Sequence, residues 1–351
     1  SNALNAELPG AGVKVTPSNT GLGLRIVADF DITRIPAGVD TLLTMTDVSP
    51  GALATFHLDS PSSNVAYYWL GRGTDDPAPE NAQAGRDGVQ LPLNADLVGS
   101  RAAFTGIYAL ERADIFNLLL IPDATRPLVS DPDRLDTNLD PNAVYAEALT
   151  YCEERRAFLL VDPPPEVGDL EAGVEWISGG LTVASANAAA NWPRVRLPDP
   201  SNEFKPRLFG PAGVIAGLYA RTDNARGLWK APAGTEARLR GVQEPAYKLT
   251  DDENGVLNPL GLNCIRSFPI YGNVCWGSRT LFGADARASE WKYVPVRRLA
   301  LYIEESLYRG IQWAVFEPND EPLWAQLRPS VGVFMHNLFT KGAFHGASAK
   351  D

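Results

Sequence analysis

The second hundred residues of the chain contain short, continuously apolar runs that alternate with helical patterns. Residues 115–121 and 157–161 form two such runs, which are typical of strands buried on both faces of a sheet. Between them, Asp140 followed by Pro141 predicts a helix start, because aspartate caps free N–H groups and proline fits the first turn. Apolar residues then recur at helical spacing until the second run begins.

This alternation continues beyond the second run. Residues 170–190 contain a further helical stretch, residues 192–197 favour a strand, and the small apolar side chains of residues 211–219 favour a buried helix. The resulting β-α-β-α-β order predicts a parallel sheet with right-handed crossovers.

The last hundred residues carry the clearest periodicity. Leu299, Ile303 and Leu307 predict one helix, with Gly310 as its stop signal. Asn319 is expected to cap a second helix, whose apolar stripe comprises Leu323, Leu327, Val331, Met335 and Leu338. Strands are expected at residues 273–276, 291–296 and 312–316.

The first hundred residues follow a different pattern. Short runs with β-branched or alternating residues are separated by proline and glycine turns, which favours a small β-rich domain over residues 10–100. Strands are expected at residues 22–30, 41–45, 55–58 and 65–70, with an exposed loop at residues 71–88.

The composition limits the class of protein. The chain has 351 residues, of which 45% are hydrophobic and 21% are charged, so a disordered, collagen-like or multi-span membrane protein is excluded. The net charge of −11 argues against a broad nucleic-acid-binding face. Residues 1–200 carry 27 acidic and 13 basic residues, whereas residues 201–351 carry 15 acidic and 18 basic residues. This asymmetry favours different partners for the two parts, and chance with a need for solubility is an equal alternative.

The sequence offers little chemistry. It contains no phosphate-binding glycine motif, no Gly-x-Ser-x-Gly motif and no His or Cys pair at metal-ligand spacing. The acidic segment with Asp131, Asp133, Asp136 and Asp140 lacks the glycine and final glutamate of a calcium loop, which favours a solvated turn. We therefore expect no catalytic residue, no cofactor and no metal site.

The cysteines are expected to be buried free thiols. There are three of them, Cys152, Cys264 and Cys275, so they cannot all be paired, and no Cys-x-x-Cys motif is present. This usage is typical of a reducing compartment.

Three classes of function remain open from the residues alone. The first is a structural assembly protein without an active site. The second is a hydrolase-like α/β enzyme that uses Ser278 or Ser306 with a distant histidine such as His336. The third is a surface-binding module that acts through the β-rich domain.

The chain resembles the tail sheath proteins of contractile bacteriophages and related contractile injection systems. The resemblance is strongest over residues 205–351, looser over residues 101–200 and weak over residues 4–100. The segments that carry it are 214–223 (VIAGLYARTD), 226–234 (RGLWKAPAG), 249–251 (LTD), 257–266 (LNPLGLNCIR), 276–281 (WGSRTL), 291–298 (WKYVPVRR), 303–306 (IEES), 312–319 (QWAVFEPN) and 323–324 (LW).

The resemblance implies a fold class and a domain layout. It implies an α+β and α/β multidomain protein, with a central α/β sheet domain at residues 101–250. A C-terminal α/β extension follows at residues 251–351, and an N-terminal β-rich, insertion-type domain precedes it at residues 4–100.

The resemblance also implies a mechanical function. Copies of the subunit would form hexameric rings that stack helically around an inner tail tube, and contraction would drive the tube through a target envelope. The implied partners are other copies of the chain, the tube protein, the baseplate and the tail terminator, without nucleic acid or membrane insertion. The particle would be a virion tail or an injection system assembled in the bacterial cytoplasm, and no signal peptide is visible. A phage, a bacteriocin-like particle and an extracellular injection system all remain open.

The family's extended N-terminal and C-terminal arms are not visible in this chain. We therefore expect a truncated piece of a longer subunit, ending before a final strand and arm. Because such arms link neighbouring subunits by adding strands to their sheets, a piece without them is expected to be a monomer or a weak dimer.

Charged residues of the C-terminal part are candidates for contacts with the tube or with other subunits. The alternative is pairing within the chain, which is expected equally, and exposed pairs are individually weak. The candidates are Arg287, Lys292, Arg297, Arg298, Glu304, Glu305 and Arg309. Four tryptophans of the same part, Trp276, Trp291, Trp313 and Trp324, are expected to be core anchors.

Overall fold

The computed structural model describes residues 13–19, 24–30, 91–200, 203–346 and 348. The chain divides into two units, residues 1–89 and 90–351. In the first unit, β1 (Val13–Asn19) and β2 (Leu24–Phe30) form an antiparallel hairpin, which confirms the strand expected at residues 22–30. The other features expected in the first hundred residues, at 41–45, 55–58, 65–70 and 71–88, lie outside the described residues.

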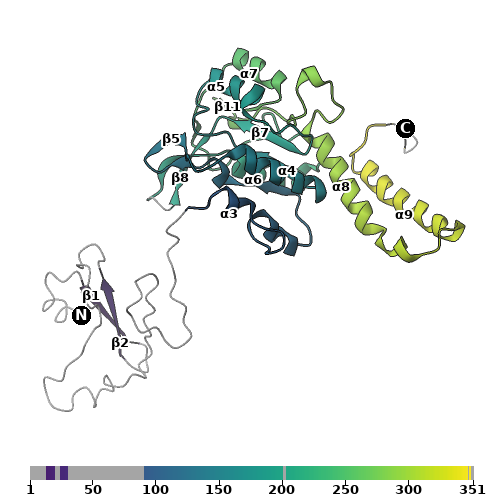
Figure 1. Cartoon of the computed structure of the whole chain (residues 1–351), viewed down its shortest axis with the longest axis horizontal. Coiled ribbons are helices and arrows are strands. Elements are labelled where there is room, and N and C mark those ends of the chain that lie inside the picture. Colours follow the sequence, from purple (N-terminus) through teal and green to yellow (C-terminus); the bar gives the residue numbers. More distant parts are fainter. Residues whose placement is uncertain (1–12, 20–23, 31–90, 201–202, 347, 349–351) are drawn as a thin grey trace. The chain divides into compact units, whose positions relative to one another are not determined.

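A five-stranded sheet lies at the centre of the second unit (Figure 1). Its parallel strands are joined at one edge by a single antiparallel strand, so the predicted β-α-β-α-β order and parallel sheet are confirmed. The strand order is β12 (Gly272–Cys275), β11 (Asn263–Phe268), β7 (Ala188–Trp192), β6 (Phe158–Val161) and β3 (Leu118–Leu120), with β12 the antiparallel member.

The described part of the unit also contains α-helices. They are α3 (Asn94–Val98), α4 (Pro141–Glu154), α5 (Leu170–Glu175), α6 (Ala212–Arg226), α7 (Asp251–Leu257), α8 (Val294–Gly310) and α9 (Glu321–Thr340). Two small antiparallel sheets complete the unit. They pair β4 (Pro127–Leu128) with β5 (Asp131–Leu135), and β8 (Val195–Asp199) with β9 (Lys205–Phe209) and β10 (Glu244–Pro245).

Strand β6 is buried on both faces, as its unbroken apolar sequence predicts. Phe158 and Leu160 belong to the core that contains α6 and the start of α8, whereas Leu159 and Val161 belong to the core that contains α4. Because side chains alternate along a strand, β6 contributes to two apolar layers at once. The sheet is therefore the middle layer of a mixed α/β structure.

Local signals fix the helix that follows β3. The carboxylate of Asp140 accepts hydrogen bonds from the backbone N–H groups of Asn142 (3.0 Å) and Ala143 (3.3 Å), and Pro141 occupies the first turn. Val144, Ala148 and Cys152 are fully buried, which confirms the predicted apolar face. All three cysteines are buried free thiols, as expected.

Asp162 joins the end of β6 to the start of α6. Its Oδ1 accepts a hydrogen bond from the backbone N–H of Ala212 at 2.7 Å, and the side chain is buried. A Cβ atom at Gly210 would lie about 2.4 Å from the carboxyl carbon, so only glycine fits there. Burial raises the pKa of Asp162 to about 6, opposed by the N–H of Ala212 and the guanidinium of Arg194.

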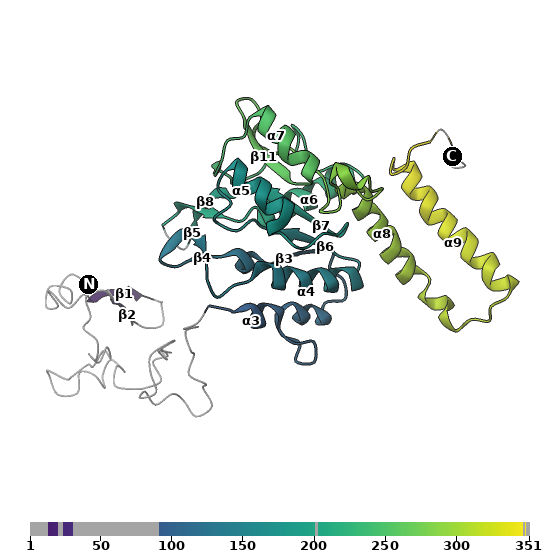
Figure 2. The ribbon, with the colours of Figure 1, turned by 45° about the horizontal axis from the view of Figure 1, so that its top comes forward.

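Helices α8 and α9 extend from the sheet as a pair (Figures 1 and 2). The rings of Tyr302 and Phe334 are in contact, with centroids 6.2 Å apart. The predicted helix ending at Gly310 is confirmed. The second helix is capped by Asp320, not Asn319. The Oδ1 atom of Asp320 accepts a hydrogen bond from the backbone N–H of Leu323 at 3.2 Å. The predicted apolar stripe is the less exposed face of α9, although only Leu338 in it is buried.

Two strands predicted in the C-terminal part are wrong. Residues 291–296 run into α8, because Pro295 in the first turn is compatible with a helix start. Residues 312–316 form the short helical turn η7 (Gln312–Phe316) between α8 and α9. A short apolar run has no periodicity of its own, so the run alone does not distinguish a strand from a helical turn.

Two other strand predictions had wrong bounds. Residues 192–197 span the end of β7 and the start of β8, which belong to different sheets. Residues 115–121 contain β3 only at their centre, and Ile115 is 54% exposed. The predicted boundary between residues 250 and 251 stays a prediction, and strands on both sides of it share the central sheet.

The tryptophan prediction was wrong for the C-terminal part. Trp313 is 44% exposed and Trp324 is 41% exposed, and Trp276 and Trp291 are only partly buried. Among the described tryptophans, the one that is fully buried is Trp192, whose indole N–H donates to the backbone carbonyl of Val167 at 2.6 Å.

Replacing Trp192 with Ala should destabilise the chain by about 3–5 kcal/mol, because a large buried side chain is lost. Trp313→Ala is the matched control and should change the free energy of unfolding by less than about 1 kcal/mol. Urea unfolding followed by circular dichroism measures both. Equal losses for the two variants would contradict the burial described here.

Asp162 should make stability depend on pH. Its pKa in the folded chain is about 6, above the ordinary value of 3.8, so the folded chain holds a proton that the unfolded chain releases. The contribution of Asp162 to stability should therefore be greatest below pH 4 and be lost as the pH rises to 6. In Asp162→Asn this loss should disappear. The melting temperature of the variant minus that of the wild type should therefore rise between pH 4 and 7. A difference that stays constant with pH would refute the assignment.

Candidate interaction surface

Two adjoining cavities lie between the beginning of edge strand β3 and the side of α8. Their volumes are about 150 Å³ and about 210 Å³. We call them together the edge groove. Its apolar wall is formed by Ile115, Phe116, Phe158, Leu228, Leu301 and Tyr302, and its polar rim by Asp114, Glu154, Arg155, Arg156, Glu305 and Arg309.

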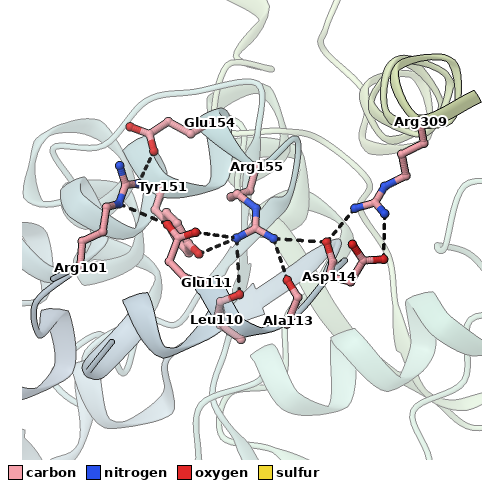
Figure 3. Close-up of polar contacts among 9 residues, drawn as sticks. All are labelled: Arg101, Leu110, Glu111, Ala113, Asp114, Tyr151, Glu154, Arg155 and Arg309. Atoms are coloured by element: carbon pink, nitrogen blue, oxygen red, sulfur yellow. Dashed lines mark hydrogen bonds and ion pairs between the residues drawn. The ribbon is translucent and has the colours of Figure 1, made fainter. Parts of the chain in front are cut away.

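Arg155, which directly follows α4, hydrogen-bonds to the chain segment on one side of the edge groove. Its guanidinium donates hydrogen bonds to the backbone carbonyls of Leu110 (3.4 Å), Ala113 (2.9 Å) and Asp114 (3.4 Å) (Figure 3). It also lies over the ring of Phe116, 5.1 Å from the centroid. One side chain thus fixes the chain segment that leads into β3.

Arg309, in the last turn of α8, reaches the same segment from the other side (Figure 3). It donates to the carboxylate of Asp114 at 2.9 Å and to the backbone carbonyl of Asp114 at 2.7 Å. Glu305 accepts from Arg309 at 2.6 Å and from Arg156 at 3.0 Å. These charged partners raise the pKa of Arg309. The network attaches the end of α8 to the edge of the sheet.

Two further interface candidates form a pair on α8. Arg297 donates to Glu304 at 3.2 Å and to the side-chain carbonyl of Asn187 at 2.7 Å. Its guanidinium lies 4.8 Å from the ring centroid of Trp291. Intramolecular pairing, the alternative weighed from the sequence, is therefore present for Arg297, Glu304, Glu305 and Arg309.

Arg298 points into the protein. It is 6% exposed and donates two hydrogen bonds to the carboxylate of Asp223, at 2.6 and 3.0 Å. Its guanidinium lies over the ring of Tyr219, 5.0 Å from the centroid. This residue fastens α8 to α6 and leaves little surface for a partner.

Arg287 and Lys292 lie before α8. Arg287 is exposed and lies over the ring of Phe282, whereas Lys292 pairs with Asp285. Arg279 also donates to Asp285, at 2.7 Å, and hydrogen bonds from Arg279 and Lys292 lower the pKa of Asp285 to about 2. The contact of these residues with a tube or a second subunit stays a prediction.

The sequence reasoning missed the groove's other half. Arg155, Arg156 and Asp114 come from the middle of the chain, where only strands and helices were considered. The available signal was the charged run from residue 153 to 156 at the end of a predicted helix, since arginines at a helix end can bind free carbonyls.

The hydrolase alternative finds no support in the described part of the chain. Ser306 lines the edge groove and Ser278 is buried, but neither hydrogen-bonds to a histidine there. His336 lies exposed on α9, and His57 is outside the described residues. No group of three or more potential metal ligands occurs among the residues that were placed. Within the same residues, no helix is long and apolar enough to span a membrane.

The chain is similar in sequence to a curated protein. No protein-family model matches it. The "Tail sheath protein" of Vibrio phage KVP40 is 29% identical over 135 residues, which are 38% of this chain and 20% of that protein. The chain thus spans about a fifth of the length of this relative.

Solved structures give a consistent comparison. The sheath complex of an extracellular contractile injection system, PVC, in its contracted state is 31% identical with a TM-score of 0.52, over 59% of this chain and 56% of that one. A sheath tail protein from Desulfitobacterium hafniense is 13% identical with a TM-score of 0.52, over 97% of this chain and 69% of that one. The second likeness concerns the fold alone, and it supports the mixed α/β class.

Removing the guanidinium of Arg298 should be costly, because Asp223 would keep a charge without its partner. We expect Arg298→Ala to destabilise the chain by about 3 kcal/mol. Arg287→Ala, in the exposed loop, is the control and should change stability by less than about 0.5 kcal/mol. Chemical unfolding measures both. A similar small effect for both would mean that Arg298 does not fasten α8 to α6.

Proposed function

We propose that this chain, a relative of the contractile tail sheath proteins, is part of a sheath subunit. Its relatives and structural neighbours are sheath subunits of phage tails and contractile injection systems. Copies of the subunit would stack as hexameric rings around an inner tube and drive the tube through a target envelope by contraction. The observation that carries this proposal is that independent sequence and structure comparisons both lead to sheath proteins.

The architecture is compatible with a mechanical part. The second unit has apolar layers on both faces of its sheet, while α8 and α9 extend from it. In a contractile assembly, energy is stored as the difference between two packings of the same folded bodies. Such a body needs surfaces that fit other copies and needs no reaction site.

The proposal assigns parts to partners. Residues 4–100 would form an outer domain, residues 101–250 the core domain, and residues 251–351 the part near the tube. The inner tube protein, the baseplate and the tail terminator are the proposed partners. The particle would be a tail or an injection system assembled in the bacterial cytoplasm.

The test uses the complete gene product that contains this sequence, expressed with a tube protein of a contractile particle. We expect cylinders in negative-stain electron microscopy, because copies of a sheath subunit assemble around such a tube. Residues 1–351 alone should sediment as a monomer or weak dimer. A complete product that never forms cylinders, or that turns over an ester or peptide substrate, would end the proposal.

A further inference from the structure

The turn between α8 and α9 carries large exposed apolar side chains. Phe316 is 97% exposed, Val315 is 69% exposed, and Trp313 and Trp324 are each more than 40% exposed. We call these four residues the hairpin tip. Trp324 is held in place, because its indole N–H donates to the side-chain carbonyl of Asn319 at 2.8 Å. Several large exposed apolar side chains in one short segment favour an interaction site.

The residues between those of the hairpin tip carry negative charge. Glu317, Asp320 and Glu321 lie between Phe316 and Trp324, residues 311–327 contain no lysine or arginine, and the nearest cation along α9, Arg328, pairs with Glu321. The hairpin tip is therefore an apolar, mainly aromatic surface with acidic residues beside it. A complementary partner surface would combine an apolar depression with hydrogen-bond donors that can donate to carboxylates.

The edge groove of the same protein has these properties. Its apolar wall includes Ile115, which is 54% exposed, and Phe116. Its lining contains four arginines and three carboxylates, and one of the arginines, Arg298, is buried against Asp223. Arg156 donates to Glu305 through one guanidinium nitrogen and lies over the ring of Tyr308, so its remaining N–H groups can donate to a carboxylate of a partner.

The hairpin tip does not fill the edge groove of its own chain. Helix α8 is continuous through Gly310, and its end is attached to Asp114 by Arg309. Phe316 remains almost fully exposed in this arrangement. A hairpin tip that occupies this groove must therefore belong to a second copy, which can approach the groove from outside.

We propose that the hairpin tip of one copy docks in the edge groove of a second copy, with Phe316 against the wall at Ile115. Such a contact joins two different surfaces, so it is heterologous and can propagate around a ring or along a helix. The inference deepens the proposed function, on which it rests for the choice of a second copy as partner. Because one small knob carries it, the contact is weak in isolated chains and gains strength in an array.

Disulfide trapping tests this contact. The three native cysteines are buried, so a cysteine introduced at the surface reacts selectively. Chains with Ile115→Cys are mixed with differently tagged chains with Phe316→Cys and oxidised mildly. The control pairs Ile115→Cys with Val129→Cys, since Val129 is 86% exposed and lies between β4 and β5.

We expect the first mixture to form mixed dimers on the order of ten-fold faster than the control, because docking raises the effective concentration of the two thiols. Adding Glu317→Lys and Asp320→Lys to the Phe316→Cys chain should slow the reaction. Equal rates in the two mixtures would overturn the proposal. Faster linking of Phe316→Cys chains with each other would overturn it too, in favour of a tip-to-tip contact.

This outcome is separable from that of the proposed function. If the complete protein forms cylinders but the trapped pair is absent, the docking inference fails alone. If the trapped pair forms but the complete protein builds no cylinders around a tube, the sheath proposal fails alone.

Discussion

Burial of β6 on both faces is the constraint from which the second unit is built. A strand with apolar side chains on both sides must be covered by a layer on each side, and α4 and α6 supply residues to the two layers. The end of β6 then places Asp162 at the start of α6, where a buried carboxylate binds a helix N–H that water cannot reach. Packing and hydrogen bonding thus fix the same junction.

Helix α8 connects the core of the second unit to the turn before α9. Its first half is anchored in the core by Val294 and Leu301 and by the pair of Arg298 and Asp223. Its last turn is attached to the sheet edge through Arg309. With both halves fixed, the turn that follows has a defined position, and its apolar residues remain outside the core. The hairpin tip and the edge groove thus have defined positions relative to each other, which is compatible with repeated assembly.

The sequence was sufficient where local signals and burial agree. The strand at 157–161, the cap at Asp140, the helix ending at Gly310 and the parallel order were all predicted, because each depends on nearby residues or on an unbroken apolar pattern. It failed at residues 291–296 and 312–316, where short apolar runs with aromatic residues read as strands. These segments became a helix start, preceded by a single β-bridge between Tyr293 and Arg279, and an exposed turn.

The candidate surface, too, was predicted only in part from the sequence. From the sequence alone came the relationship to sheath proteins and the set of charged residues on α8. Only the tertiary structure decided that Arg298 is buried against Asp223, that Glu305 joins Arg156 to Arg309, and that Asp114 completes a groove with α8. Apart from Glu305 and Arg309, which are four positions apart on α8, these partners are separated by 75 to 195 positions along the chain. The type of a charged residue limits what it can bind, but the fold determines which opposite charge comes within hydrogen-bonding distance and how much water remains between them.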